Sequence, residues 1–251
     1  MSKLSVVILT KNEENNILDC LESIKSLDEI IIIDDYSEDR TLEIVKKFDN
    51  EIKIFKRAVE KDFSAQRNFG LNKASFEWVL FIDADERVSE ALASEISNFH
   101  FQIPNNVKGF YIKRRDVMWG RELKYGETRN VKLLRLARRD AGRWVGKVHE
   151  VWNIDGKIGE LDNGLIHYPH QTIREFLSEI SLYSSIRAKE LHEKRIKVSA
   201  LDVIFYPKAK FFLNYFLKLG FLDGLPGLIV TFMMSFHSFL VRSKLWLNNK
   251  N

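Results

Sequence analysis

The chain has 251 residues, of which 45% are apolar and 29% charged, which excludes wholesale disorder and allows a sizeable hydrophobic core. Its one cysteine, Cys20, excludes an intrachain disulfide and a cysteine-rich zinc module. The net charge of +4 conceals an asymmetry, because residues 1–100 hold 13 Lys and Arg against 21 Asp and Glu, and residues 101–251 hold 26 against 14. The acidic part is suited to hold a cation, and the basic part to face an anionic surface or a phosphorylated ligand.

The first 115 residues alternate between apolar runs, which predict strands, and apolar stripes at helical spacing, which predict helices. The predicted strands are Val6–Leu9, Ile30–Ile33, Ile52–Phe55 and Trp78–Ile82; the predicted helices are Asn15–Ser26, Leu42–Phe48, Ala65–Lys73 and Glu90–Asn98. Strands separated by helices imply an α/β fold with a parallel sheet and right-handed crossovers.

After residue 100 this alternation ends. Strand-like pieces occur at Gly109–Lys113, Lys132–Leu136 and Gly164–His167, and helical stretches run from about Thr172 to Lys194 and from Leu201 onward. We therefore expect an α/β nucleotide-binding half, a mixed region and a helical tail.

The tail contains a run without charged residues, Leu225–Val241, whose 17 residues are at the lower limit for crossing a bilayer. The polar His237 and two serines weaken a spanning interpretation. Bases mixed with aromatics between Lys208 and Lys218 are typical of interfacial helices. We expect membrane-surface contact through residues 205–246, with a buried helix or a dimer face as the alternative. The N-terminus runs straight into a strand without signal-peptide features, so we expect a cytoplasmic protein, peripheral on the inner face of the cytoplasmic membrane.

Polar clusters follow three of the predicted strands, at Thr10–Glu14, Asp34–Asp39 and Asp83–Arg87. Ligands of open α/β sheets bind beyond the carboxyl ends of the strands. Asp83 and Asp85, directly after an apolar strand, could bind Mg²⁺ or Mn²⁺, which take carboxylate oxygens and leave positions for phosphates. Each cluster alone could equally be turn and capping chemistry.

Arg67 and Lys73 are bases in an otherwise acidic region. They could support the acidic loops or a ligand phosphate, or they could lie on a solvated helix face. The chain has no GxGxxG and no GxxxxGK[ST] loop, which argues against a dinucleotide dehydrogenase and a P-loop NTPase.

Four segments, in this order and spacing, resemble the family 2 glycosyltransferases: Val6–Glu13, Ile33–Thr41, Ala65–Asn68 and Phe81–Arg87. The resemblance is firm over roughly the first 90 residues and looser through Lys147–Glu150 and His167–His170. Within the family, the chain is most similar to short bacterial enzymes of lipopolysaccharide core or envelope glycan synthesis. One departure is Tyr36, where a glycine is usual.

The resemblance implies a GT-A fold, a nucleotide-sugar donor, which we expect to be UDP-linked, and inversion at the anomeric carbon. Thr10, Asn12 and Glu13 would line the base and ribose pocket, Asp34 would contact base or ribose, and Asp83 and Asp85 would bind the metal, Asp85 more directly. The expected parts are a donor-binding half (1–115), an acceptor-side and catalytic-base region (116–198) and a helical tail (199–251). The acceptor would be a glycolipid or lipid-linked saccharide.

An inverting transfer needs a base for the acceptor hydroxyl. The resemblance favours Glu150 as this base, with His149 on the acceptor or metal side; a surface salt bridge is the alternative for Glu150. His167 and His170 form an HxxH whose Pro169 argues against a helical metal pair, so we expect a structural or acceptor-side role.

Ten Lys and Arg between Arg114 and Arg143 predict mostly a solvated basic face, with a minority that contact phosphates or an anionic acceptor. No recognition motif for nucleic acid is present, so we expect no such partner. Two other functions remain as alternatives: a sugar nucleotidyltransferase, which would normally have a Gly-rich N-terminal loop, and a non-catalytic membrane-surface protein on the same fold.

Overall fold

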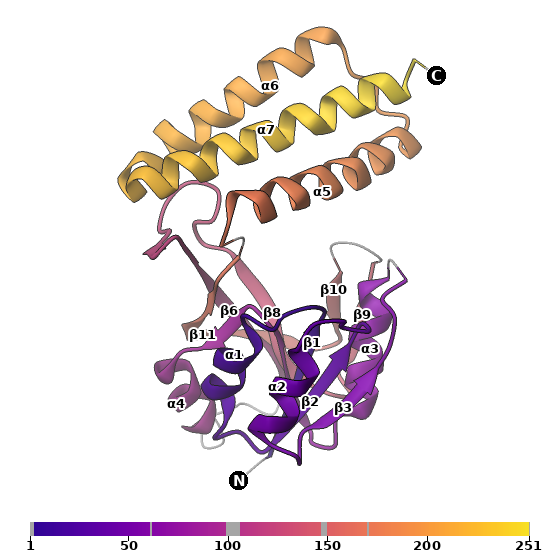
Figure 1. The fold of residues 1–251 in the computed structure, drawn as a ribbon, viewed down its shortest axis with the longest axis vertical. Helices are drawn as coiled ribbons and strands as arrows, with labels where there is room; N and C mark the ends of the chain where they lie inside the picture. The colour runs from indigo at the N-terminus through magenta and orange to yellow at the C-terminus, as the bar shows by residue number, and fades with distance from the viewer. Residues whose placement is uncertain (1–2, 61, 99–105, 147–149, 170, 251) are drawn as a thin grey trace. The chain divides into compact units, whose positions relative to one another are not determined.

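The computed structural model describes residues 3–60, 62–98, 106–146, 150–169 and 171–250 (Figure 1). Their contacts divide the chain into two compact units. Unit 1 contains residues 1–114 and 130–167, and unit 2 contains residues 115–129 and 168–251. The functional division at residues 115 and 198 stays a prediction.

Unit 1 is built from strands and helices that alternate at first and are mainly strands after residue 106. Its helices are α1 (Ile17–Ile24), α2 (Thr41–Phe48), α3 (Phe63–Lys73) and α4 (Glu90–Asn98). Its strands are β1 (Leu4–Thr10), β2 (Glu29–Asp34), β3 (Lys53–Lys56), β4 (Trp78–Asp83), β5 (Glu86–Val88), β6 (Val107–Met118, which continues into unit 2), β8 (Lys132–Arg138), β9 (Gly142–Val145), β10 (Val151–Ile154) and β11 (Lys157–His167).

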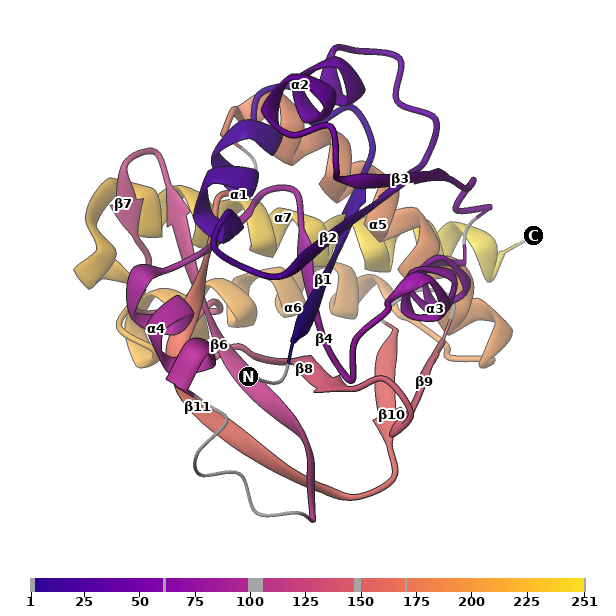
Figure 2. The same ribbon diagram turned by 90° about the horizontal axis from the view of Figure 1, so that it is seen from below.

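The central sheet has the order β3-β2-β1-β4-β8-β6-β11-β5 (Figure 2). Strands β3, β2, β1 and β4 are parallel, whereas β8 is antiparallel to β4 and to β6, and β5 is antiparallel to β11. The predicted α/β fold with helices on the sheet is confirmed, and the parallel part consists of the four strands expected from the sequence. The order reverses between β1 and β4, which is where such sheets bind ligands.

Both faces of β1, β2 and β4 are buried, so these strands consist mainly of continuous apolar runs. Val6 and Ile8 of β1 face the cluster that contains α1, and Val7 faces the cluster that contains α3 and two tryptophans, Trp144 and Trp152. Cys20 of α1 is fully buried in the first cluster, as expected for a packing residue.

Unit 2 combines a hairpin with a helical bundle. The hairpin is the end of β6 with β7 (Arg121–Glu122); the helices are α5 (Ile173–Glu193), α6 (Ala200–Phe212), the π-helix η2 (Leu213–Leu217), the 3₁₀ helix η3 (Gly220–Asp223) and α7 (Gly224–Asn248). Helix α7 packs against both α5 and α6 (Figure 1). The core of the unit joins the hairpin to the helices through Met118, Leu123, Phe176, Ile180, Val230 and Met233.

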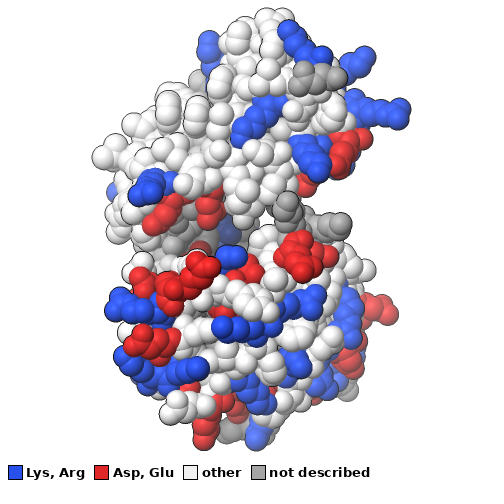
Figure 3. Space-filling model, turned by 45° about the vertical axis from the view of Figure 1, so that its right-hand side comes forward, with Lys and Arg blue, Asp and Glu red and all other residues white. Residues whose placement is uncertain are grey.

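Helix α6 buries none of its residues fully, and large apolar side chains along it and along the following turns are exposed. Leu201, Phe205, Phe212 and Phe216 lie at helical spacing and are 48–65% exposed. Figure 3 shows broad uncharged areas over this unit, interrupted by patches of Lys and Arg and by smaller patches of Asp and Glu. Within the described residues, Gly220–Asn248 is long and apolar enough to cross a membrane, and buried core helices of soluble proteins can have the same length and composition.

Candidate active site

The carboxyl ends of β1, β2 and β4 meet at one edge of the sheet in unit 1. Thr10 is in register with Asp34, and Leu9 with Asp83, so the three polar clusters are neighbours. The hydroxyl Oγ1 of Thr10 is buried and has no hydrogen-bond partner among the described residues.

The loops after β1 and β2 are tied together by short hydrogen bonds. Asn12 donates its backbone N–H to Ser37 Oγ at 2.9 Å and accepts from the Glu38 N–H at 2.8 Å through its side-chain oxygen, and the Glu13 N–H donates to Thr41 Oγ1 at 2.7 Å. Tyr36, with φ of 53°, adopts the left-handed conformation that glycine favours. The unusual tyrosine thus preserves a turn suited to glycine.

Asp34 has no exposed surface, and both of its oxygens accept hydrogen bonds from Ser37. Direct contact of Asp34 with a base or ribose stays a prediction, because in this conformation its oxygens make hydrogen bonds within the loop. Its carboxylate shapes the loop that would surround such a ligand.

Glu13 lies partly buried beside the acidic residues of the site. Burial raises the pKa of Glu13 to about 7, the hydrogen bond from Asn16 opposes this rise, and the charges of Asp85 and Asp83 add to it. A cation bound beside Asp85 and Asp83 would lower the pKa of Glu13, because a nearby positive charge favours the ionised carboxylate.

Asp83 is held by two buried arginines. Arg67 Nη2 donates to one oxygen at 3.0 Å, and Arg135 Nη2 donates to the other at 2.5 Å. Burial alone would raise the pKa of Asp83, but the charges of Arg135 and Arg67 outweigh burial and hold this pKa well below its usual range. The negative charge of Asp83 is therefore already compensated by the protein.

Asp85 has a different neighbour, since its Oδ2 lies 3.2 Å from Nε2 of His167, at the end of β11. A carboxylate oxygen is a ligand of Mg²⁺ and Mn²⁺ in proteins, whereas an imidazole nitrogen favours transition metals over Mg²⁺. Within the described residues, no three His, Cys, Asp or Glu side chains form a metal-binding group. Asp85 and His167 are the described side chains at this edge that could hold a divalent metal.

Glu150 lies across this edge, where its Oε1 accepts from Arg67 Nε at 2.8 Å. Arg67 thus joins Glu150 to Asp83, although 83 and 16 residues separate it from them. His149 and His170 lie outside the described residues. Lys73 lies over the rings of Phe55 and Phe69, with its Nζ 4.7 and 5.1 Å from their centroids.

Sequence reasoning missed three parts of this site: Arg135, Glu86 and the place of His167. Glu86 is 1% exposed, accepts from the backbone N–H of Asp83 at 2.9 Å, and has its pKa raised by burial against the effect of Arg135. One signal was present for Arg135, because it interrupts the apolar run Leu133–Ala137. Nothing local signals His167, which reaches Asp85 because β11 pairs with β5.

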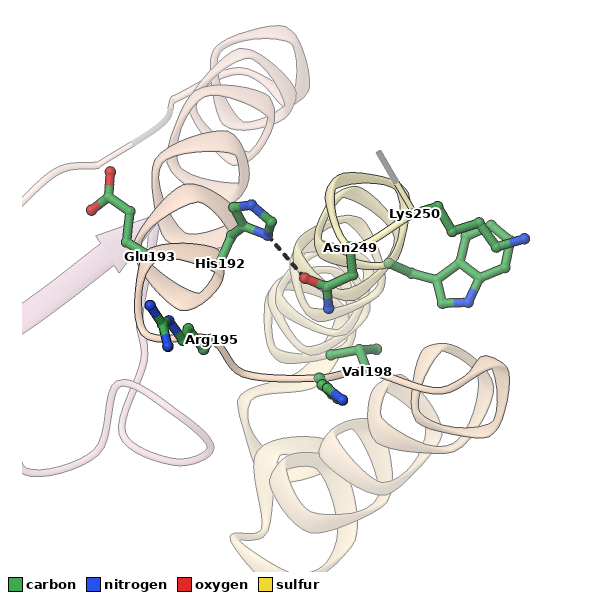
Figure 4. Close-up of a pocket in the computed structure, with 8 residues that line it drawn as sticks. His192, Glu193, Arg195, Val198, Asn249 and Lys250 are labelled. Carbon is green, nitrogen blue, oxygen red and sulfur yellow. Dashed lines mark hydrogen bonds between the residues drawn. The ribbon is translucent and has the colours of Figure 1, made fainter.

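Unit 2 contains a separate open hollow of about 660 Å³, shown in Figure 4. It is lined by His192, Glu193, Arg195, Lys197, Val198, Trp246, Asn249 and Lys250. Asn249 fixes its shape, with its Oδ1 2.9 Å from His192 Nδ1 and its Nδ2 donating to the Ile196 carbonyl at 3.0 Å. The cations stand at the C-terminal ends of α5 and α7, where the helix dipoles favour positive charge, and this explains them without a ligand.

The sheet edge with its acidic pair is the candidate active site, and sequence comparison identifies the family of the chain. The profile described as Glycosyl transferase family 2 matches residues 5–147, more than half of the chain. The chain belongs to this family, is a glycosyltransferase and has the GT-A fold.

Relatives match over nearly the whole chain. The lipopolysaccharide core biosynthesis glycosyltransferase LpsC of Rhizobium meliloti is 28% identical over 97% of this chain and 92% of its own length. An uncharacterised glycosyltransferase of Rickettsia typhi is 28% identical over 98% of this chain and 87% of its own. Among solved structures, residues 1–349 of Staphylococcus aureus TarS align with a TM-score of 0.50 at 17% identity, covering 99% of this chain and 91% of that one.

Proposed function

We propose that this glycosyltransferase moves a sugar, with inversion at its anomeric carbon, from a UDP-linked donor to a lipid-linked or lipopolysaccharide-type acceptor, using Mg²⁺ or Mn²⁺. The observation that carries the proposal is the Asp83–Asp85 pair at the end of β4, with a third carboxylate, Glu150, on the same side of the site. Similarity to LpsC over 97% of this chain and 92% of LpsC supports the acceptor class. TarS, which shares the fold, has been crystallised with UDP-GlcNAc, and this supports the donor class.

The two aspartates take different roles in this proposal. Asp85 with His167 would hold the metal, because the charge of Asp83 is already balanced by two guanidinium groups. The oxygens of Asp83 keep lone pairs that can accept from a hydroxyl of the donor. When bound, the divalent ion would neutralise the charge that develops on the departing diphosphate.

Glu150 acts as the base in this proposal. The acceptor hydroxyl oxygen forms a bond to C1 of the sugar as the bond between C1 and the diphosphate oxygen breaks. The diphosphate leaves with the electron pair of that bond, and the hydroxyl proton goes to the Glu150 carboxylate. Thr10, Asn12 and Glu13 line the nucleotide side, directly or through the loop that they fix.

Contact with a lipid surface fits the proposed acceptor. The exposed stripe Leu201, Phe205, Phe212 and Phe216 has Lys208 beside it, with its Nζ 5.9 Å from the Phe205 ring centroid. Aromatic and aliphatic side chains next to lysines are typical of helices that lie at the surface of an anionic bilayer. We therefore propose a peripheral protein on the cytoplasmic face of the membrane, bound through unit 2.

Thermal unfolding with UDP and Mn²⁺ tests the donor site. We expect UDP with Mn²⁺ to raise the Tm of the wild type by several degrees, and UDP with a chelator to raise it less, since binding to the folded state stabilises it. Asp85→Asn should abolish the metal-dependent part, whereas Glu51→Gln, at an exposed position away from the site, should retain it. No shift with any pair of nucleotide and metal would contradict the proposal.

The reaction products separate the alternatives. A screen of UDP-sugars that detects released UDP, with mass detection of the free sugar, should show slow transfer to water. Release of pyrophosphate from a nucleoside triphosphate and a sugar phosphate would instead indicate a nucleotidyltransferase. Membrane binding without any donor cleavage would indicate a non-catalytic protein.

A further inference from the structure

We infer that Arg67 is a positioning residue that holds Glu150 in place for the reaction, and that it does not bind the donor phosphates. The inference rests on the proposed role of Glu150 as the base. Arg67 belongs to α3, is 5% exposed, and directs two donors to carboxylates from two other parts of the chain.

The geometry of the guanidinium group carries this inference. Its Nε donates to Glu150 Oε1 at 2.8 Å and its Nη2 donates to Asp83 Oδ1 at 3.0 Å. These two nitrogens share one edge of a rigid planar group, so they hold the two acceptors side by side. Two carboxylates at such close range would otherwise repel each other.

The guanidinium group is itself fixed by packing. Its central carbon lies 4.8 Å from the centre of the Trp144 ring and 5.8 Å from that of Phe81. Asn68, one residue further along α3, ties the helix to β9 by donating to the Trp144 carbonyl at 2.8 Å and accepting from its N–H at 3.0 Å. The fold therefore fixes the position of Arg67, and Arg67 in turn fixes the position of the Glu150 carboxylate through their hydrogen bond.

The burial of the Arg67 guanidinium group argues against binding of a ligand phosphate, which was one of the two roles considered from the sequence. Both nitrogens on the shared edge are occupied by protein carboxylates, and the third, Nη1, is buried, with no partner among the described residues. Asp83 keeps a second anchor in Arg135 when Arg67 is removed, whereas Glu150 has no second ion pair within the described residues. Loss of Arg67 should therefore affect Glu150 most.

A double-mutant cycle tests this inference, with UDP release from UDP-glucose or UDP-N-acetylglucosamine, whichever is cleaved faster, as the measured reaction. Water replaces the unidentified acceptor and also needs a base. Glu150→Gln should lower kcat by ~10²–10⁴-fold, in the range of general bases. Arg67→Gln should lower kcat ~10–10³-fold with the KM for the donor nearly unchanged, because a misplaced base affects the reacting geometry. The double variant should be no slower than Glu150→Gln.

Two variants control for a general loss of structure. Arg143→Gln removes an exposed arginine that donates to Asn72 at 2.7 Å, and it should leave kcat unchanged. Arg67→Lys keeps the positive charge but loses the pair of N–H donors on one edge of the guanidinium group. Its kcat should lie between those of Arg67→Gln and the wild type. If Arg67→Gln does not fold, Arg67→Lys takes its place in the double-mutant cycle.

The outcomes distinguish the two proposals. The positioning role would be overturned if the kcat losses of the two single variants multiply in the double variant. It would also be overturned if Arg67→Gln raises the KM for the donor and leaves kcat unchanged. Either result would leave the proposed function standing. Full activity of Glu150→Gln would overturn both the base and the role of Arg67. No UDP release by the wild type from either donor would count against the proposed function itself.

Discussion

Asp83 and Asp85 are separated by one residue, yet their carboxylates have opposite surroundings. Asp83 meets two guanidinium groups and Asp85 meets one imidazole. Because a cation binds best where negative charge is not yet compensated, we propose that Asp85, and not Asp83, binds the metal. Both residues are aspartates, so the sequence alone does not distinguish them. Their different neighbours are the reason that we propose different roles for Asp83 and Asp85.

Glu13 makes stability depend on pH in a direction opposite to that of most carboxylates. Its pKa is raised from 4.5 to about 7 in the folded protein, so the folded state holds a proton that the unfolded state loses. The contribution of Glu13 to the free energy of unfolding should therefore be most favourable below about pH 4.5, and it should fall as the pH rises to about 7. Above pH 7 the loss should be complete, on the order of 2 kcal/mol given the partial exposure of the group.

Unfolding by urea at pH 5 and pH 7.5 measures this effect. Glu13→Gln keeps an oxygen that can accept from Asn16 and cannot ionise, so its stability should fall less between these two values than that of the wild type. Glu51→Gln serves as the control and should follow the wild type. An equal pH dependence in Glu13→Gln and the wild type would contradict the raised pKa.

Helix α3 brings several features of the site together at the scale of the element. It contains Arg67, its first turn is capped by the Asp62 carboxylate, which accepts from the Ala65 N–H at 2.9 Å, and its buried face includes Gly70. A Cβ on Gly70 would lie 2.6 Å from a methyl group of Val7 and 3.1 Å from a side-chain carbon of Ile33. This glycine therefore lets the helix lie close on β1 and β2.

Gly70→Ala should destabilise the protein by about 1–2 kcal/mol, although alanine is the better helix former. The steric cost of overpacking outweighs the gain of about 1 kcal/mol in helix propensity. Ser94→Ala, at an exposed position of α4, is the control and should be neutral or slightly stabilising. Denaturant unfolding of the wild type, Gly70→Ala and Ser94→Ala measures these differences in stability. A Gly70→Ala variant more stable than the wild type would show that α3 can shift away from β1 and β2 without cost.

The elements of the first hundred residues, apart from the short β5, could be predicted from the sequence because their signals are local. Apolar runs mark the buried strands, and helical stripes such as Ile17, Cys20, Leu21 and Ile24 mark the helix faces. The direction and neighbours of β8 and β11 could not be predicted, since pairing depends on contacts distant in sequence. Arg135 and His167, which these strands carry, were missed in the site for that reason.

The surface of unit 2 gives the prediction that belongs to the whole molecule. We expect the protein to float with phosphatidylglycerol vesicles more than with phosphatidylcholine vesicles, and less at high salt, because lysines accompany the apolar stripe. Replacing Phe205, Phe212 and Phe216 by serine should weaken binding at least ~10-fold, since these exposed rings would enter the lipid interface.

Leu18→Ser with Tyr111→Ser removes two exposed apolar side chains of unit 1 and should leave vesicle binding unchanged. If the wild type stays with the aqueous fraction and elutes as a dimer that the three serines dissociate, the stripe is an interface between copies. The composition of residues 205–246 could indicate a region of membrane contact. Which side of α6 is exposed could not be predicted, because it depends on how α7 packs against α6.

The hairpin of residues 115–129 has a consequence for exchange of segments between relatives. Met118 and Leu123 are buried against Phe176 and Val230, and the Asp223 carboxylate accepts from the backbone N–H groups of Lys124 and Tyr125 at 3.1 and 2.9 Å. A chimera that takes its helices from another family member but keeps this hairpin would join two mismatched halves of one core. Recombination, natural or engineered, must therefore move residues 115–129 and 168–251 together, although 38 residues of the other unit lie between them in the chain.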